Sequence, residues 1–306
     1  MTTALRVAIA VLTYRRNDDL AALLPLLREQ ADASREGVRI LVVDNDPDAG
    51  AASAVRAYAE RGIEYLHEPV PGISAARNRA LDAAQGDDVL VYIDDDERPT
   101  AGWLESLLRV YRTHRPAGVV GPVISQYAHE PEEFINAGRF FERRRLPTGT
   151  AVTVAATNNL LLDVRAVGAL RFDPDFGISG GSDTLFTRQL VHAGGRLLWC
   201  DEAIVHDVVP PTRLSRDWVL GRAFRSGNSW SRTSIRLART PLERATTRLR
   251  LTAEGLARLA SGGSLRVMGE VTRAQHLQAR GLRRLKRGSG MLSGAWGHVY
   301  SEYRRS

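Results

Sequence analysis

The first 124 residues alternate between short apolar runs and longer amphipathic segments. Val7–Leu12 and Val89–Ile93 are continuous apolar runs of the length that predicts buried strands. The segment between Asn17 and Gln30 has helical spacing instead, and either Asn17 or Asp18 can cap this helix. Strands separated by helices predict a mostly parallel sheet wrapped by helices, which is an α/β fold.

The rest of the chain divides into elements by the same criteria. Further strands are expected at Val38–Val43, Ile63–Leu66, Val119–Ser125, Leu160–Leu162, Arg196–Trp199 and Ala203–Val205. Further helices are expected at Ala51–Arg61, Ser74–Ala84 with Ser74 as its cap, Trp103–His114 and Thr184–Ala193. Residues 126–150 are polar and irregular, and residues 172–183 form a glycine-rich loop. From Leu214 to about Arg287 the pattern is helical, with breaks expected at Gly262, Gly263, Gly288 and Gly290.

Composition narrows the class of protein. The chain has 306 residues, of which 43% are hydrophobic and 25% charged, and this excludes wholesale disorder and collagen-like composition. A single cysteine, Cys200, excludes an intramolecular disulfide and a cysteine-rich zinc module. No segment has the roughly 20 apolar residues that span a bilayer, and the N-terminus lacks a signal-peptide pattern. We therefore expect a cytoplasmic protein.

Polar residues follow three of the predicted strands. These strand ends are Thr13–Arg16, Asp44–Asp46 and Asp94–Asp96. Ligands of such sheets bind beyond the carboxyl ends of the strands. The acidic triplet suits Mg²⁺ or Mn²⁺, which prefer oxygen ligands; the alternative is an acidic turn before the helix at Trp103. The first strand is not followed by G-x-G-x-x-G, so a nicotinamide cofactor is not expected.

Four single residues have both a structural and a functional interpretation. Asp44 can accept hydrogen bonds from a ribose or a base, or it can belong to a simple turn. Arg77 can meet a base or a phosphate, or it can be a solvated arginine. Asp183 either caps a helix or lies in a mobile acceptor site. His206 is either a structural histidine or an additional metal ligand.

In combination, several segments make the chain resemble family 2 glycosyltransferases of the GT-A fold. The matching segments are Val7–Arg16, Val42–Asp46, Gly72–Asn78, Ile93–Glu97, Thr157–Asp163 and Gly177–Asp183. They follow the order of the family and cover about residues 5–230. Residues Pro210–Trp230 look like the subgroup that includes succinoglycan-type bacterial glucosyltransferases. The resemblance implies a GT-A catalytic domain at 1–212, with a nucleotide-sugar half at about 1–125 and an acceptor half at about 126–212. Residues 213–306 then form a basic, mainly helical extension.

The resemblance also implies roles for the residues at matching positions. The nucleotide sugar would be bound by Thr13, Tyr14, Arg16, Asp44, Arg77, and by Asp94 or Asp95 at the ribose and sugar. A divalent metal, Mg²⁺ or Mn²⁺, would be bound by Asp96, with His206 as an additional ligand. Asp183 would be the general base. The acceptor or the diphosphate would meet Asn159, Gly181, Ser182, Arg222 and Arg225. Two departures matter: Ser182 stands where the family usually has Glu, and the Q-x-x-R-W motif of polymerising synthases is absent.

The implied activity is transfer of a sugar, with inversion, from a nucleotide-diphosphate sugar to a hydroxyl acceptor. The acceptor class is left open between a glycan, a lipid-linked molecule and a natural product. One alternative is a sugar-nucleotide nucleotidyltransferase, which should carry a glycine-rich phosphate loop after the first strand. The other is a basic nucleic-acid-binding protein, which would leave the acidic triplet unexplained; nucleic acid is therefore not the expected partner.

The basic C-terminal segment has three interpretations. From Pro211 onward there are 20 basic and 5 acidic residues, a net charge of +15, whereas the preceding residues carry 22 basic and 30 acidic, a net charge of −8. The segment can contact the inner face of the membrane through arginines and an apolar side. It can instead follow nucleic-acid phosphates, or pack on the catalytic domain with its arginines in solvent or at a pyrophosphate acceptor. The apolar side would consist of Leu265, Met268, Leu282 and Leu285.

Overall fold

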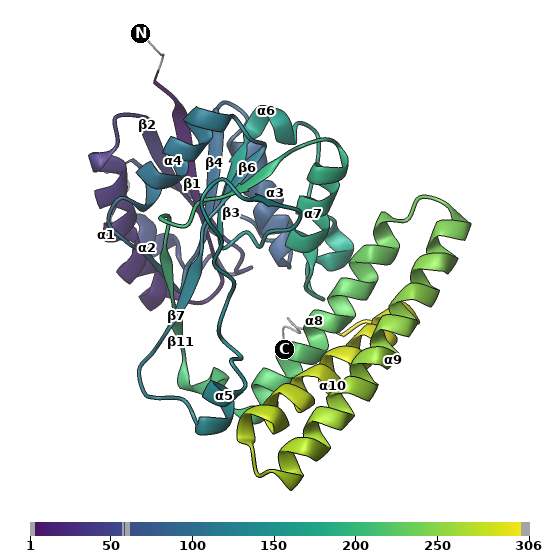
Figure 1. Ribbon diagram of the computed structural model, residues 1–306. Helices are drawn as coiled ribbons and strands as arrows, with labels where there is room; N and C mark the ends of the chain where they lie inside the picture. Colours follow the sequence, from purple (N-terminus) through teal and green to yellow (C-terminus); the bar gives the residue numbers. More distant parts are fainter. Residues whose placement is uncertain (1–3, 57, 59–61, 301–306) are drawn as a thin grey trace. The chain divides into compact units, whose positions relative to one another are not determined.

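The computed structural model describes residues 4–56, 58 and 62–300. These residues form two compact units (Figure 1). The first unit comprises residues 1–124, 143–177 and 182–208, and the second comprises residues 125–142, 178–181 and 209–306. Two short segments that precede residue 212 therefore group with the C-terminal helices.

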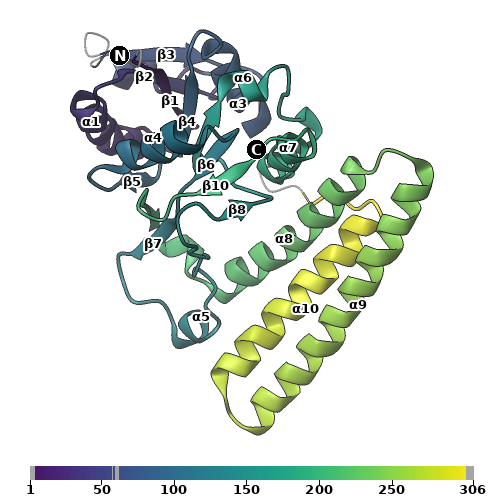
Figure 2. The same ribbon diagram turned by 45° about the horizontal axis from the view of Figure 1, so that its top comes forward.

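The first unit is built on an eight-stranded sheet in the order β3-β2-β1-β4-β9-β6-β10-β8 (Figures 1 and 2). Its strands are β1 (Arg6–Thr13), β2 (Gly37–Asp44), β3 (Ile63–His67), β4 (Val89–Asp94), β6 (Gly118–Val120), β8 (Ala151–Val152), β9 (Asn159–Asp163) and β10 (Leu197–Trp199). The first four strands in the chain are parallel neighbours. In contrast, β9 runs antiparallel to both β4 and β6, so the sheet is mostly parallel but mixed.

Helices cover this sheet on both faces, which leaves its central strands buried. The helices of this unit are α1 (Asn17–Ala33), α2 (Ala52–Arg56), α3 (Ile73–Ala83), α4 (Trp103–His114), α6 (Val164–Val167), α7 (Ser182–His192) and the 3₁₀ turn η2 (Pro174–Phe176). Alternate residues of β1 belong to two different core clusters, Ile9 to one and Ala10 to the other. This alternation explains why the central strands are continuous apolar runs in the sequence.

The expected elements of the first unit are largely present, with different caps. α4 has the predicted ends, and the helix predicted between Asn17 and Gln30 is present as α1 with its leucine face buried. However, Arg16 precedes α1 without a side-chain cap, and the Asn17 amide donates to the carbonyl of Gly50 instead. Ser74 lies inside α3, where its hydroxyl donates to the carbonyl of Asp173. The end of the helix expected at 51–61 lies outside the described residues.

A smaller, three-stranded sheet lies beside the ends of the main strands. Its order is β5-β11-β7, with β5 at Glu97–Pro99, β11 at Val205–Val209 and β7 at Val123–Tyr127. The expected strand at 203–205 is therefore displaced, and His206 and Asp207 lie within β11 instead of after a strand. Because β5 directly follows the acidic triplet, this sheet positions the residues around it.

The second unit is helical. It contains α5 (Glu133–Ala137), the 3₁₀ turn η3 (Pro211–Arg213), α8 (Arg216–Leu237), α9 (Pro241–Val271) and α10 (Gln275–Ala295). The last three helices pack along one another (Figure 2). None of the helices in the described part of the chain combines the length and apolar character needed to cross a membrane.

The glycines expected to break the C-terminal helices lie inside them. Gly262 is in α9 and Gly288 and Gly290 are in α10. A Cβ atom on Gly290 would come within 2.0 Å of the Phe224 carbonyl oxygen, and one on Gly262 within 2.8 Å of the Leu285 nitrogen. The prediction of breaks was wrong. Gly262, Gly288 and Gly290 allow close contact between helices, which outweighs their cost of about 1 kcal/mol each in helix propensity. Gly263 also lies inside α9, but an added Cβ there would meet nothing within 4 Å.

Candidate active site

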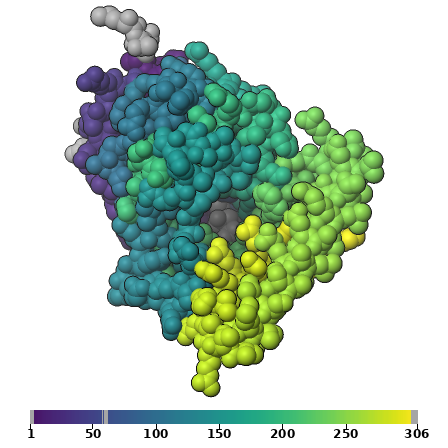
Figure 3. Space-filling view, in the orientation of Figure 1, coloured from purple at the N-terminus to yellow at the C-terminus, as the bar shows by residue number. Residues whose placement is uncertain are grey.

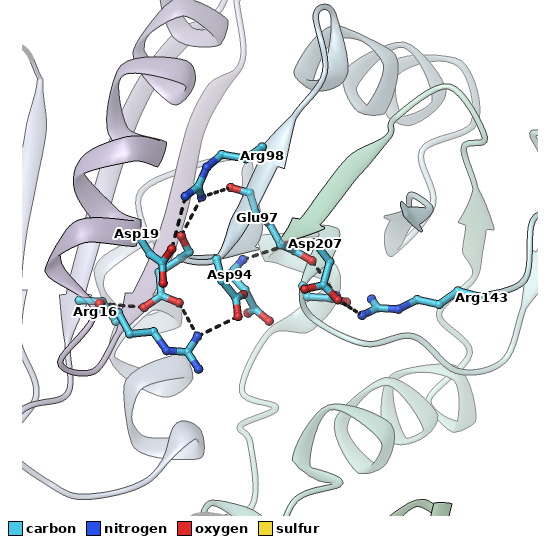
Figure 4. A network of polar contacts seen from close by, with 11 residues as sticks. Arg16, Asp19, Asp94, Glu97, Arg98, Arg143 and Asp207 are labelled. Atoms are coloured by element: carbon cyan, nitrogen blue, oxygen red, sulfur yellow. Dashed lines mark hydrogen bonds and ion pairs between the residues drawn. The ribbon is translucent and has the colours of Figure 1, made fainter. Parts of the chain in front are cut away.

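Carboxylates gather at the carboxyl ends of β1 and β4 (Figure 4). The hydroxyl of Thr13, the last residue of β1, donates to Asp95 over 2.9 Å. The guanidinium of Arg16 lies 3.0 Å from Asp95 and 2.9 Å from Asp96. Parallel pairing of β1 with β4 brings these residues together although they are some 80 positions apart in the chain. The clustering expected from the sequence is therefore present.

Asp94, Asp95 and the adjacent Glu97 resist ionisation. Burial raises the pKa of Asp94 to about 7, and the neighbouring Asp96 carboxylate adds to the rise while Arg77 opposes it. Burial likewise raises the pKa of Asp95 to about 6, against the opposing charge of Arg16. Burial, followed by the charge of Asp94, holds the pKa of Glu97 well above its usual value. An added cation would stabilise the ionised forms, so the cluster is suited to binding one.

A second polar layer, which sequence reasoning missed, supports the triplet (Figure 4). Glu97 accepts from the backbone nitrogen of Asp94 at 3.1 Å and from the amide of Asn158 at 2.8 Å. Across the β5–β11 pair, Asp207 lies opposite Glu97 and forms a 2.6 Å ion pair with Arg143. Glu97 could have been found from the sequence, because it continues the run of acids that begins at Asp94. Arg143 could not, because it lies in a segment that the sequence marks only as irregular.

The neighbouring asparagine has a different environment from that expected. Asn159 is buried, and its amide donates to the carbonyls of Pro122 at 3.0 Å and Ala203 at 2.7 Å. Its side-chain oxygen accepts from the indole of Trp103 at 2.9 Å. Both amide donors are therefore used inside the protein, so we give Asn159 a structural role and do not assign it to the acceptor or the diphosphate.

The metal-binding residues implied by the resemblance lie on or next to the β5–β11 ladder. His206 pairs with Arg98, and the backbone nitrogen of Val208 bonds to the carbonyl of Asp96 at 3.2 Å. Asp96, in the turn before β5, therefore lies across from Val208, two residues after His206. Within the described residues, Nδ1 of His206 is buried and has no hydrogen-bond partner.

This donor set fits one kind of metal site. Over residues 4–56, 58 and 62–300, no group of three or more His, Cys, Asp or Glu side chains is arranged to hold a metal. Mg²⁺ and similar ions commonly take one or two carboxylates and complete their shell with water and substrate phosphates. Asp96, with the unpaired Nδ1 of His206, fits that arrangement.

Asp44, at the end of β2, is fully buried, and its carboxylate accepts three hydrogen bonds. One oxygen accepts from the backbone nitrogen of Asp46 at 3.0 Å, and the other accepts from Ala51 and from the Tyr65 hydroxyl, both at 2.9 Å. The carboxylate thus holds the turn after β2 and fixes the tyrosine on β3. Any contact with a nucleotide would be made by a carboxylate that already supports the fold.

We expect Asp44→Ala to lower the free energy of unfolding by roughly 3 kcal/mol, because it leaves three buried donors without their acceptor. Asp48→Ala is the matched control, since Asp48 lies in the same turn with a side chain exposed to solvent. Urea denaturation followed by circular dichroism measures both variants. Equal stabilities would show that Asp44 does not hold this turn.

Arg77 and Ser182 connect α3 with the start of α7. The Arg77 guanidinium donates to the Ser182 hydroxyl and lies 5.4 Å from the centre of the Phe172 ring. Both residues are buried, and Arg77 is near enough to Asp94 to influence its pKa, where burial is the largest effect. Arg77 therefore positions the first turn of α7 close to the carboxylate cluster. This contact spans 105 positions of sequence.

Asp183, the expected base, lies in the first turn of α7. It is partly exposed, and one carboxylate oxygen accepts from the backbone nitrogen of Thr184 at 2.7 Å. The carboxylate is thus oriented by its own helix and bonds the next residue rather than capping the helix from outside. A partly exposed carboxylate oriented in this way is accessible to a ligand.

An open pocket of about 590 Å³ lies at the ends of β1 and β2. Its lining is highly charged and consists of Arg15, Arg16, Asn17, Asp18, Asp19, Asp46, Asp48 and Gly50. Tyr14 precedes it, with the Arg15 guanidinium 5.4 Å from its ring centre. Arg16 belongs both to this pocket and to the carboxylate cluster, so the two are continuous.

Three of the expected acceptor or diphosphate residues belong to the second unit. Gly181 has a φ of +92° and faces Ser229 of α8 closely, so a side chain at Gly181 would be strained. The guanidinium of Arg222 lies 5.5 Å from the Trp218 ring centre, and that of Arg225 also lies 5.5 Å from it. Both arginines are therefore held against an aromatic surface of their own unit.

Comparison with known proteins identifies relatives of the chain. The family model described as glycosyl transferase family 2 matches residues 8–169. The succinoglycan biosynthesis protein ExoM of Rhizobium meliloti (strain 1021) is 36% identical over 233 residues, which cover 74% of this chain and 75% of ExoM. The pre-mycofactocin glycosyltransferase of Mycobacterium tuberculosis is 31% identical over 204 residues, which cover 64% of this chain and 42% of the relative.

Solved structures share the fold. The mannosyltransferase PcManGT from Pyrobaculum calidifontis, in complex with GDP-Man and Mn²⁺, has a TM-score of 0.66 at 17% identity, over 96% of this chain and 88% of that one. S. aureus TarS 1-349 in complex with UDP-GlcNAc has a TM-score of 0.53 at 15% identity, over 96% and 93% of the two chains. The expected GT-A architecture is confirmed.

Proposed function

The chain belongs to glycosyltransferase family 2, and we propose that it transfers a sugar from a nucleotide-diphosphate sugar to a hydroxyl acceptor with inversion. This membership makes the chain a glycosyltransferase, in place of the nucleotidyltransferase and the nucleic-acid-binding protein considered above. The observation that supports the proposal is the carboxylate cluster of Asp94–Asp96, which lies in the same unit as the oriented carboxylate of Asp183.

The donor would bind at the carboxyl ends of β1, β2 and β4. Arg16 and the charged pocket beside it would supply groups for the nucleotide, and Tyr14, whose ring lies against the guanidinium of Arg15, would add an aromatic surface. Asp94 or Asp95 would accept hydrogen bonds from ribose or sugar hydroxyls. Thr13 supports this step by holding the Asp95 carboxylate in place, and Arg77 supports it by positioning α7.

Asp96, with His206 as an additional ligand, would hold a divalent metal, Mg²⁺ or Mn²⁺. When bound, this ion neutralises negative charge on the leaving nucleoside diphosphate. Arg16 forms an ion pair with Asp96 in this structure, so the same guanidinium keeps the carboxylate paired when no ion is present.

Asp183 would accept the proton of the acceptor hydroxyl as that oxygen attacks the anomeric carbon. The bond from the anomeric carbon to the diphosphate oxygen breaks in the same displacement, and the nucleoside diphosphate leaves. A single displacement inverts the anomeric centre, so one carboxylate base is sufficient. No residue needs to form a covalent bond with the sugar.

The helical unit itself carries groups that would suit an acceptor bearing phosphate. Arg222 and Arg225, both held on Trp218, are suited to a diphosphate group, since guanidinium groups recognise phosphate oxygens. A lipid-linked acceptor carries such a group, and the net charge of +15 from Pro211 onward favours contact with an anionic membrane.

Thermal-shift measurements test the donor class directly. A panel of nucleotide sugars with Mn²⁺ should raise the melting temperature for at least one member, because a ligand of the native state stabilises it. That donor should then release nucleoside diphosphate when a hydroxyl acceptor is added. Release of pyrophosphate from a sugar 1-phosphate and a nucleoside triphosphate, with no donor recognised, would refute the proposal.

A further inference from the structure

Helix α9 has two opposite faces, each with its own seven-residue repeat. Gly255, Gly262 and Gly269 are buried. A Cβ atom on Gly262 or Gly269 would meet the backbone of α10 or of the turn before it at 2.6–2.8 Å. Leu242, Leu249 and Leu256 recur with the same spacing on the other face and are exposed. Seven residues are nearly two helical turns, so each repeat drifts only about 20° per step and remains on its own face.

The exposed face is apolar along most of the helix. Leu242, Leu249 and Leu256 have 74%, 65% and 54% of their surface exposed. Val267 and Val271 extend the same stripe toward the end of the helix and are also exposed. In the space-filling view, the light-green residues of this helix form a continuous part of the molecular surface (Figure 3).

This arrangement is the reverse of that in an ordinary surface helix. In water, a helix buries its leucines and turns small or polar residues outward. Here α9 buries Leu251 but otherwise packs on α10 largely through glycines, and it leaves Leu242, Leu249 and Leu256 outside. Helices in lipid show this pattern, because close packing of small residues joins the helices and the apolar side chains face hydrocarbon.

The charges of the helical unit decide whether α9 could cross a membrane or lie on its surface. Arg248 and Arg266 are exposed and flank the stripe on one side, and Arg250 flanks it on the other; Arg266 and Arg250 also form ion pairs with Glu270 and Glu254. α10 adds the exposed Arg284 and Lys286 and contains no acidic residue. With so many charges α9 does not cross a bilayer, whereas a helix with one apolar face and flanking arginines lies in the plane of an anionic membrane surface.

We infer that α9 docks on an anionic lipid bilayer, with Leu242, Leu249, Leu256, Val267 and Val271 inserted at the level of the headgroups. This deepens the membrane contact proposed above. It also corrects the residues expected from the sequence. Leu282 packs in an aromatic cluster of its own unit, and Leu285 lies 3.0 Å from the position of a Cβ atom on Gly262, so neither faces outward.

Vesicle co-sedimentation tests the inference without donor or acceptor, so its result is independent of transferase activity. The probe is the full chain with vesicles of phosphatidylglycerol and phosphatidylcholine in equal parts. We expect binding to these vesicles and much weaker binding to pure phosphatidylcholine. Leu249→Gln/Leu256→Gln leaves the charge unchanged and should lower partitioning by about 100-fold, since burial of each leucine is worth about tenfold or more.

The matched control is Val70→Gln/Val299→Gln, which changes two comparably exposed residues outside α9 and should bind as the unaltered chain does. Circular dichroism establishes that both variants are folded. Unchanged binding of the leucine variant would overturn the inference, because the contact would then be electrostatic only. A dimer in light scattering that the leucine variant dissociates, with vesicle binding retained, would also overturn it and assign the stripe to a second copy of this chain.

Discussion

Asp183→Asn is expected to lower the rate of sugar transfer by about 10²- to 10⁴-fold, the usual cost of losing a general base. Donor affinity should stay within a few-fold, because the base acts on the acceptor proton and not on the nucleotide. Asparagine keeps the oxygen that accepts from the backbone of Thr184, so the first turn of α7 should keep its stability. Release of nucleoside diphosphate in the presence of acceptor, beside a donor titration, measures both quantities.

Asp175→Asn provides the matched control, since it makes the same change at an exposed acid of the preceding loop and should leave the rate near that of the unaltered chain. Activity of Asp183→Asn within a few-fold of the unaltered chain would remove this residue from the mechanism. Asp207 and Asp201, two other acids of this unit, are less suitable as bases. Asp207 is paired with Arg143, and a hydrogen bond from Arg145 lowers the pKa of Asp201 and makes it a weaker base.

Removal of divalent metal with EDTA is expected to weaken nucleoside diphosphate binding by at least about tenfold, the effect seen when the surroundings of a metal site are disturbed. Asp96→Ala should cause a similar loss in the presence of Mn²⁺. EDTA should then have little further effect on the variant, because both changes remove the same interaction. Calorimetric titration in the four combinations of protein and EDTA measures this coupling.

The non-additivity separates the role of Asp96 as a metal ligand from its ion pair with Arg16. If only the ion pair mattered, EDTA would weaken binding equally in both proteins. Asp82→Ala is the control for loss of a carboxylate, since Asp82 forms an exposed ion pair with Arg171 away from the cluster. Identical affinity of the unaltered chain with and without EDTA would contradict metal dependence.

The strands and helices of the catalytic unit could be predicted because their signals are local. A strand buried on both faces needs apolar residues at every position, and β1 and β4 show such runs. α4 begins and ends as expected because its apolar spacing covers the whole helix. The clustering of Asp95 with Thr13 also followed from the sequence, since parallel neighbouring strands end at one edge of the sheet.

Details of the site depended on contacts that no local pattern contains. Asn158 and Asn159 are adjacent and chemically identical, yet Asn158, in the turn before β9, contacts Glu97, whereas Asn159, the first residue of β9, contacts Trp103. Arg77 meets Ser182 across 105 positions. The antiparallel insertion of β9 between β4 and β6 creates the first of these arrangements and has no signature in the strand itself.

The sequence by itself determined the alternating strands and helices, the acids at their carboxyl ends and the basic character of the last 96 residues, 211–306. Each of these depends on spacing or composition, which a single segment contains. The tertiary structure alone decided which carboxylates are paired, as for Asp44 and Asp207, and which face of α9 is exposed. A glycine in a helix is unfavourable by its own propensity, and only the approach of a second helix makes Gly262 favourable. Such choices depend on the surfaces that distant segments present to one another.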